Sequence, residues 1–258
     1  MTRRFGRRSL IKGAAASLTS LALAGCDRLG SQAWVQNGME SAEEMTRYVQ
    51  ALLLRSAPLA REYSAADISP DFRANGTTRI DDVEYQSMAE AGFADWRLAV
   101  DGLVEQGVKL SLEDLRGMPS RTQITRHDCV EGWSCIGQWT GVPLGLVLER
   151  ARLKPGAKYI VFRCADSLEQ TLDDSGQYYE SIGLEDAFHA QTILAYEMNG
   201  KPLPVAHGAP LRLRVERQLG YKMAKFIMRI EAVDSFAGIG RGKGGFWEDR
   251  GYEWYAGI

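Results

Sequence analysis

The residues best suited to chemistry lie in the segment Thr-Arg-His-Asp-Cys-Val-Glu-Gly-Trp-Ser-Cys-Ile-Gly-Gln-Trp-Thr-Gly-Val-Pro-Leu, residues 125–144. Its centre is Cys129, and a thiolate is a soft, strongly donating ligand that suits a metal centre or nucleophilic catalysis. The glycines and the two tryptophans that follow, Trp133 and Trp139, indicate a bent backbone with flat side chains, as a large planar ligand would need. The competing interpretation is a small buried thiol packed beside core tryptophans, since most free cysteines are buried and inert.

Two structural alternatives would give Cys129 another role. His127, Cys129 and Cys135 could form a zinc site, although structural zinc usually takes four ligands in paired spacings. A disulfide between Cys129 and Cys135 would remove the free thiol. If Cys26 is modified as described below, three cysteines remain, including Cys164, and an odd number leaves at least one thiol for another task.

Several short elements must position this segment. The alternation of apolar and polar residues from Trp96 to Val104, followed by residues 108–112 after Gly107, predicts a hairpin. A capped short helix is expected from Ser111, because the segment Ser-Leu-Glu-Asp has a capping-box pattern. Further along, we expect a strand at 123–126 that leads to Cys129, a helix at 144–151, a strand at 159–164, and a hairpin turn at Asn199-Gly200.

The segment Cys-Val-Glu-Gly-Trp-Ser, followed by Trp-Thr-Gly-Val-Pro-Leu, resembles the sulfite oxidase-like molybdopterin oxidoreductases. Further matches extend this resemblance over roughly residues 70–235. It implies an α+β, mixed and β-rich sulfite oxidase-type molybdopterin-binding domain. It also implies a Mo-molybdopterin cofactor, with Cys129 as the protein ligand of the metal, and two-electron oxygen-atom transfer as the reaction.

The resemblance also implies which residues hold the cofactor. A Phe-x-x-Asn segment places Asn75 beside the pterin, and the segment from His207 to Val215 supplies a His and an Arg. Arginine and lysine side chains suit the pterin phosphate, the first by a two-pronged hydrogen bond and the second as a point charge. For Cys164, which ends a strand, a small buried residue is the competing interpretation. The expected cofactor-binding residues are Asn75, Cys129, Cys164, His207, Arg212, Lys222, Met223, Ala224 and Lys225.

The expected substrate pocket lies above Cys129, walled by Trp133, Trp139 and a tyrosine from Tyr178-Tyr179, with Tyr178 and Trp133 as catalytic candidates. Sulfite-oxidising relatives hold their anion with arginines at two positions that here are Ala74 and Ser134. An anion without paired cations loses hydration at a high free-energy cost.

The absence of these two arginines favours a neutral substrate, a small or peptide-bound sulfoxide, as in the methionine-sulfoxide reductase branch. His207 and the neighbouring Arg73 instead favour sulfite oxidation. A non-catalytic exported lipoprotein is the third hypothesis.

Residues 1–25 look like a targeting segment and not part of the fold. Arg7-Arg8 with the following apolar stretch is typical of a twin-arginine export signal, and Leu-Ala-Gly-Cys resembles a lipoprotein box ending in Cys26. We therefore expect a periplasmic protein anchored to a membrane by a lipid, with a tether and N-terminal helix over residues 26–60 and the oxidoreductase domain over residues 61–258.

The resemblance implies a haem-containing membrane or periplasmic partner for electron transfer. Residues 1–25 hold five basic residues and no acid, so the remaining chain carries 26 basic and 33 acidic residues. This balance disfavours a nucleic-acid partner.

Overall fold

The computed structural model describes residues 59–169, 171 and 176–258, together with single positions at 32, 34, 35, 38, 42 and 45. The segment Pro58–Ile258 forms one unit, and only this unit is considered below. The expected signal segment, Cys26 and most of the expected helix from Ser41 lie outside the described residues. Within the described part of the chain, every helix is too short or too polar to cross a membrane.

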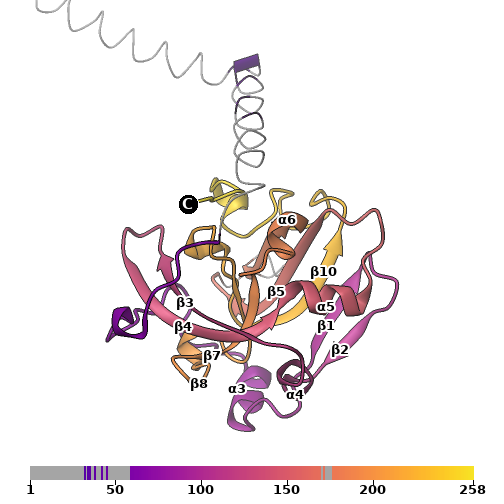
Figure 1. The fold of residues 1–258 in the computed structure, drawn as a ribbon. Coiled ribbons are helices and arrows are strands. Elements are labelled where there is room, and N and C mark those ends of the chain that lie inside the picture. Colours follow the sequence, from indigo (N-terminus) through magenta and orange to yellow (C-terminus); the bar gives the residue numbers. More distant parts are fainter. Residues whose placement is uncertain are drawn as a thin grey trace, which may run out of the picture. The chain divides into compact units, whose positions relative to one another are not determined.

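Two five-stranded sheets form the framework (Figure 1). In the first sheet, β1 pairs parallel with β10 and all other neighbours are antiparallel. Its spatial order is β2 (Val108–Leu110), β1 (Leu98–Gly102), β10 (Ile227–Val233), β5 (Tyr159–Ser167) and β6 (Gln177–Gly183). The predicted hairpin is confirmed, because Leu98 faces Leu110 and Val100 faces Val108 across β1 and β2.

The second sheet is antiparallel and carries the Cys129 segment. Its order is β3 (Arg121–Asp128), β4 (Ser134–Pro143), β7 (Ile193–Met198) and β8 (Lys201–Pro202), and β9 (Arg212–Arg214) pairs with β7. The predicted Asn199-Gly200 turn is confirmed between β7 and β8. Both residues have positive φ angles, 51° and 72°, as a two-residue type I′ hairpin requires.

Short helices fill the connections and cover the sheets. The α-helices are α3 (Val83–Glu90), α4 (Leu112–Arg116), α5 (Leu144–Ala151) and α6 (Leu184–Ala187), and the 3-10 helices are η1 (Ala65–Asp67), η2 (Val205–His207), η3 (Gly220–Lys222) and η4 (Glu248–Arg250). The bounds of α5 agree with the prediction. Ser111 caps α4 by accepting a hydrogen bond from the backbone N–H of Asp114, also as predicted. The helix α3 had no counterpart in the sequence-based expectations.

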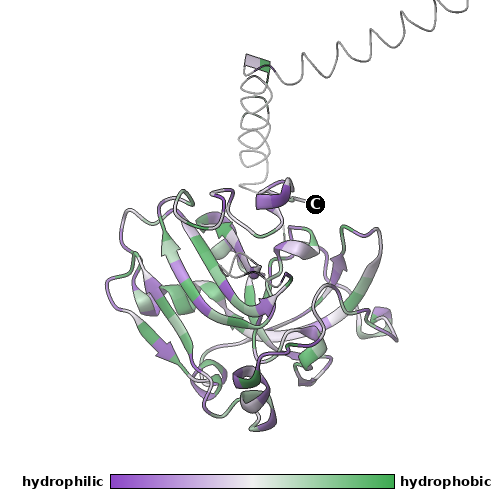
Figure 2. Ribbon diagram, turned by 180° about the vertical axis from the view of Figure 1, so that it is seen from behind, coloured by the Kyte–Doolittle hydropathy of each residue, from purple (hydrophilic) through white to green (hydrophobic). Residues whose placement is uncertain are grey.

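Hydrophobic residues alternate with polar ones along several strands. In Figure 2 the colour of these strands changes between green, for hydrophobic residues, and purple, for hydrophilic ones. In β3, Gln123, Thr125 and His127 are buried, while their neighbours Thr122 and Arg126 are exposed. A larger apolar core lies around the first sheet, and a smaller one around the second contains Phe72 and Trp139. The mixed sheets with few, short helices confirm the predicted α+β, β-rich class.

One buried ion cluster changes the interpretation of Lys222. Its ammonium lies 2.5 Å from Glu180 Oε1 and 2.5 Å from Glu248 Oε1, and all three side chains are at most 1% exposed. Burial raises the pKa of the Glu180 carboxyl well above its usual range, with the Lys222 charge opposing that rise. The sequence-based expectation placed Lys222 at a cofactor phosphate, whereas the structure places its charge between two carboxyl groups.

We therefore expect Lys222→Met to lower the free energy of unfolding by about 3–5 kcal/mol, because it leaves buried carboxyl groups without their counter-charge. Urea denaturation of the apoprotein measures this effect. Lys201→Met is the control, since Lys201 is exposed on β8 and its replacement should change stability by roughly 0.5 kcal/mol or less. Equal stabilities for the two variants would contradict the structural role.

Candidate active site

Cys129 lies in the loop of the β3–β4 hairpin. Asp128 and Ser134 are the last paired residues of the two strands, and the loop closes through two backbone hydrogen bonds, Cys129 N–H to Trp133 O and Gly132 N–H to Cys129 O. Gly132 has a φ angle of 84°, a left-handed conformation that glycine adopts without strain. The sheet thus holds the thiol at a fixed point, as the predicted strand before Cys129 required.

This thiol opens on a pocket whose wall comes from distant parts of the chain. The lining combines the 75–77 turn, the Cys129 loop, the ends of β5 and β6, the η3 turn and the C-terminal segment. Of the predicted site residues, Asn75, Cys129, Tyr178, Met223 and Lys225 are brought together here. The complete lining is Asn75, Gly76, Thr77, Cys129, Val130, Glu131, Asp166, Leu168, Tyr178, Gly220, Tyr221, Met223, Lys225, Trp247 and Tyr252.

Burial raises the pKa of the Cys129 thiol, so in the apoprotein it is a thiol and not a free thiolate at neutral pH. A coordinated metal ion would reverse this, since it deprotonates a ligating thiol. Tyr178 is almost fully buried, and its hydroxyl donates a 2.6 Å hydrogen bond to the backbone carbonyl of Tyr221. Burial raises the pKa of Tyr178 well above its usual range, so this hydroxyl keeps its proton.

Lys225 fastens the 75–77 turn to the rest of the site. Its ammonium donates to the carbonyl of Asn75 at 2.5 Å, to that of Thr77 and, at 3.4 Å, to that of Ala206. Burial lowers the pKa of Lys225 to about 7. Gly208 makes room for this side chain: a Cβ at that position would lie 2.7 Å from Lys225 Cβ. Asn75 therefore contributes its backbone carbonyl to the site where it was predicted to lie.

Asp166, near the end of β5, is a pocket residue that the sequence-based interpretation missed. It is 4% exposed, and its Oδ1 atom has no hydrogen-bond partner among the described residues. Burial raises the pKa of this carboxyl to about 6, with a hydrogen bond from Thr77 opposing the rise. The signal that could have identified Asp166 is an acidic residue near the end of a strongly apolar strand. Two aromatic residues of the C-terminal segment, Trp247 and Tyr252, also line the pocket.

Arg212 and His207 carry buried polar atoms that a ligand could satisfy. Arg212 is fully buried on β9; its Nη1 donates to the carbonyl of His207 at 3.0 Å. Its Nε and Nη2 atoms have no acceptor within the described ranges. The Nδ1 atom of His207 also has no hydrogen-bond partner among the described residues. Burial lowers the pKa of Arg212 to about 9 and that of His207 to about 4. Two free guanidinium donors fit the phosphate of a pterin cofactor.

Seven predicted residues lie outside the pocket lining: Trp133, Trp139, Cys164, His207, Arg212, Lys222 and Ala224. Trp133 is in the Cys129 loop, where its Nε1 donates to Glu131 at 2.9 Å and Arg73 lies over its ring. Trp139 is fully buried in β4 beneath Arg212 and Arg214, 4.8 and 4.4 Å from its ring centre.

Cys164 and Ala224 are core residues, and burial raises the pKa of the Cys164 thiol well above its usual range. Of the expected wall, Tyr178 lines the pocket, whereas Tyr221 and Trp247 are found there in place of the two tryptophans. A buried small residue, the competing interpretation of Cys164, agrees with its position.

The two structural alternatives for Cys129 find no support. Cys129, Cys135 and Cys164 are all free thiols in the described part of the chain. His127 and Cys135 face each other across β3 and β4. Even so, within residues 59–169 and 176–258 no three His, Cys, Asp or Glu side chains are arranged to hold a metal ion.

Comparison with known families decides the assignment. Residues 85–237 match the model of the oxidoreductase molybdopterin binding domain, which is more than half of the chain. The chain belongs to this family. It is thus a molybdenum cofactor-dependent oxidoreductase of the sulfite oxidase type, and Mo-molybdopterin is its cofactor.

The chain is similar to two curated proteins and to one solved structure. The Azospira oryzae protein YedZ1, named as a protein-methionine-sulfoxide reductase subunit, is 34% identical over 99% of this chain and 87% of its own length. The protein-methionine-sulfoxide reductase catalytic subunit MsrP of Xanthomonas axonopodis pv. citri is 36% identical over 62% of this chain; the match spans 56% of MsrP. A solved structure, the sulfane dehydrogenase SoxCD of Paracoccus pantotrophus, is 26% identical with a TM-score of 0.48, over 55% of this chain and 39% of that chain.

Proposed function

We propose that this oxidoreductase reduces sulfoxides, either small molecules or methionine sulfoxide within peptides. The observation that carries the proposal is the charge of the pocket. Among the described residues that line it, none is an arginine, and its two acids, Glu131 and Asp166, outnumber its one cation, Lys225. A neutral S=O group can enter such a pocket without the paired cations that an anion requires. The names of YedZ1 and MsrP support the same substrate class.

The cations near the pocket have other partners. Lys225 donates to three backbone carbonyls. Arg73, which sequence reasoning considered as an anion-binding residue, lies 3.9 Å from Glu131 and stacks over Trp133. Ser134 stands at one of the positions where sulfite-oxidising relatives place an arginine. Its hydroxyl donates a hydrogen bond of 2.5 Å to Asp128 Oδ1. Lys225 and Arg73 thus both have partners within the protein.

The residues of the chain have separable tasks in this reaction. When bound, the molybdenum cofactor supplies two-electron oxygen-atom transfer. Cys129 anchors its metal and Arg212 its phosphate, while Tyr178, Tyr221 and Trp247 exclude water from the substrate. The S=O bond breaks, the sulfur keeps the electron pair delivered by the reductant, and the oxygen leaves as water after taking up two protons. Asp166 is placed to hold a proton near the pocket, because its pKa is about 6.

Steady-state assays on one molybdenum-replete preparation test the substrate. We expect a sulfoxide to have a specificity constant roughly two to four orders of magnitude above that of sulfite, since two absent charged hydrogen bonds correspond to about 3–6 kcal/mol. A higher specificity constant for sulfite would overturn the proposal. That result would instead favour sulfite oxidation, for which His207 and its free Nδ1 are the supporting observation.

We also propose twin-arginine export to the periplasm, a lipid anchor at Cys26 and electron delivery from a haem-containing partner in the membrane or periplasm. Arg7-Arg8 and the Leu-Ala-Gly-Cys segment support export and anchoring. Cys26→Ser should move the protein from the membrane to the soluble periplasmic fraction with unchanged activity. Mass spectrometry of the wild type should show an acylated Cys26 at the mature N-terminus, and an unmodified N-terminus would contradict the anchor.

A further inference from the structure

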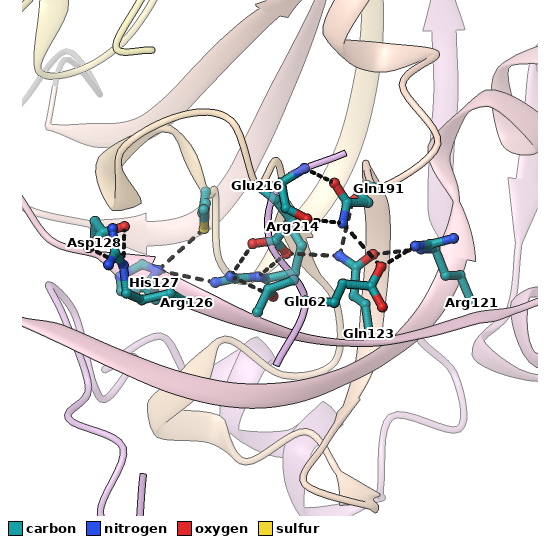
Figure 3. A network of polar contacts seen from close by, with 12 residues as sticks. Glu62, Arg121, Gln123, Arg126, His127, Asp128, Gln191, Arg214 and Glu216 are labelled. Atoms are coloured by element: carbon teal, nitrogen blue, oxygen red, sulfur yellow. Dashed lines mark hydrogen bonds and ion pairs between the residues drawn. The ribbon is translucent and has the colours of Figure 1, made fainter. Parts of the chain in front are cut away.

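A continuous polar network runs through the interior of the domain and ends beside the active site (Figure 3). It begins at Gln191, whose carbonyl accepts from Gln123 at 3.0 Å, and continues from Gln123 to Glu216 at 2.8 Å. Glu216 holds Arg214 through hydrogen bonds of 2.9 and 2.6 Å. Arg214 then reaches His127, two residues before the metal ligand, and His127 in turn contacts the sulfur of Met223.

The network determines which nitrogen of His127 carries the hydrogen. Arg214 Nη1 lies 3.1 Å from His127 Nδ1, and a guanidinium has donors but no acceptor. Met223 Sδ, 3.3 Å from the same nitrogen, is only a weak acceptor, so we assign the lone pair of Nδ1 to the charged Arg214 donor and the hydrogen to Nε2. Glu216 keeps Arg214 in place with both carboxylate oxygens, and this ion pair is at most 1% exposed. His127 is thus a donor with a fixed direction.

That donor has no recipient in the part of the chain that the structure describes. His127 is 0% exposed, and its Nε2 atom has no hydrogen-bond partner. A buried donor without a partner is unfavourable, so a ligand that supplies the acceptor would recover free energy. The apolar rings nearby, Phe72 and Trp133, have centroids 5.8 and 5.7 Å from the imidazole and provide no strong acceptor.

The imidazole adjoins two residues that line the pocket. A Cβ on Gly220 would lie 2.5 Å from His127 Nε2, so only the absence of a side chain at this position lets the ring approach. On the other side of the ring, Met223 Sδ lies 3.3 Å from Nδ1. Gly220 and Met223 both belong to the pocket lining, as does Cys129. The Nε2–H edge therefore packs against Gly220, a residue of the pocket wall.

We propose that His127 donates a hydrogen bond from Nε2 to the molybdenum cofactor beside Cys129, and that the Arg214–Glu216 pair orients this donor. His127 is a positioning and tuning residue, and it does not touch the substrate. The inference rests on the cofactor of the family and is independent of whether the substrate is a sulfoxide. A hydrogen bond to the ligands of a metal stabilises its electron-rich reduced state and raises its reduction potential.

The test compares His127→Met, which removes the donor at similar volume, with His127→Gln, whose amide can donate from the same region. In loaded protein, His127→Met should lower the molybdenum reduction potential and change the Mo(V) electron paramagnetic resonance spectrum, while His127→Gln stays near the wild type. Loss of molybdopterin from folded His127→Met, with content retained in His127→Gln, would also support the proposal. Wild-type potential and spectrum in a cofactor-replete His127→Met protein would overturn it.

Thr125→Val is the matched control. Thr125 is the preceding inward residue of β3 and contacts Arg214 Nη2 at 3.4 Å, so its replacement removes one weak contact while the two hydrogen bonds from Arg214 to Glu216 remain. Its potential should equal that of the wild type. A lowered potential in Thr125→Val would contradict a specific role of His127.

If His127→Met does not fold, isotope labelling of the wild-type histidines tests the proposed hydrogen bond. Protein grown with ¹⁵N-histidine should show a nitrogen coupling to Mo(V) in pulsed electron paramagnetic resonance. His127→Gln should lose this coupling although His207 is still labelled. Absence of the coupling in the wild type, or its persistence in His127→Gln, would overturn the proposal.

Discussion

Cys129→Ser is expected to abolish turnover, with a loss of more than about 100-fold. Substituting a partner that only supports a metal ligand typically costs about 10–100-fold, and Cys129 is the ligand itself. A serine hydroxyl is a harder and weaker donor than a thiolate, so the metal would lose its soft protein ligand. The hairpin loop should survive, because its two closing hydrogen bonds involve only the backbone of Cys129. Steady-state assays normalised to molybdopterin content measure the loss.

Cys135→Ser is the matched control for this prediction. Cys135 lies opposite His127 on β4, and its thiol contacts the carbonyl of Asp71 at 3.9 Å, away from the pocket lining. Its activity should remain within about a factor of three of the wild type, as expected for a substitution costing less than roughly 0.7 kcal/mol. Full activity of Cys129→Ser, or an equal loss in both variants, would be incompatible with the ligand assignment.

Arg212→Met is expected to weaken cofactor retention by roughly two to four orders of magnitude. Its Nε and Nη2 atoms have no acceptor among the described residues, and each charged hydrogen bond to a phosphate contributes about 1.5–3 kcal/mol. Because the guanidinium is fully buried and its pKa is lowered to about 9, its charge is unfavourable in the apoprotein. Removing it should therefore leave the stability of the apoprotein unchanged or raised. Equilibrium dialysis of molybdopterin and urea denaturation measure the two effects.

Weaker cofactor binding without a loss of apoprotein stability would distinguish a ligand role of Arg212 from a structural one. Arg229→Met is the control, since Arg229 is an arginine of the first sheet that is paired with Asp101 at 2.8 Å. It should bind the cofactor as tightly as the wild type. If Arg212→Met instead unfolded the apoprotein and retained molybdopterin, Arg212 would be a structural residue.

The parts of the fold that sequence reasoning anticipated are those with local causes. The α4 cap at Ser111 needs Asp114 three residues away, and the Asn199-Gly200 turn needs only two positive φ angles. Helix α5 also follows from its own apolar spacing, with Leu144, Val147 and Leu148 buried. By contrast, α3 buries only Tyr85, so its sequence lacks the apolar stripe that a helix prediction needs.

The site shows the same division. The motif around Cys129 placed the thiol in the pocket, because a short segment holds both the residue and its hairpin. The partners of Lys222 could not be anticipated, since Glu180 and Glu248 lie 42 and 26 residues away in sequence. Trp139 was misplaced because spacing alone does not say which face of β4 is inward. The free donors of Arg212 and His127 become visible only when all neighbouring acceptors are placed.

The most direct test of the central claim is X-ray absorption spectroscopy at the molybdenum edge, on wild type and Cys129→Ser loaded with cofactor. The account predicts one more sulfur neighbour of molybdenum in the wild type than in Cys129→Ser, with the same spectrum in wild type and Cys135→Ser. An unchanged number of sulfur neighbours in Cys129→Ser would contradict the assignment of Cys129 as the metal ligand.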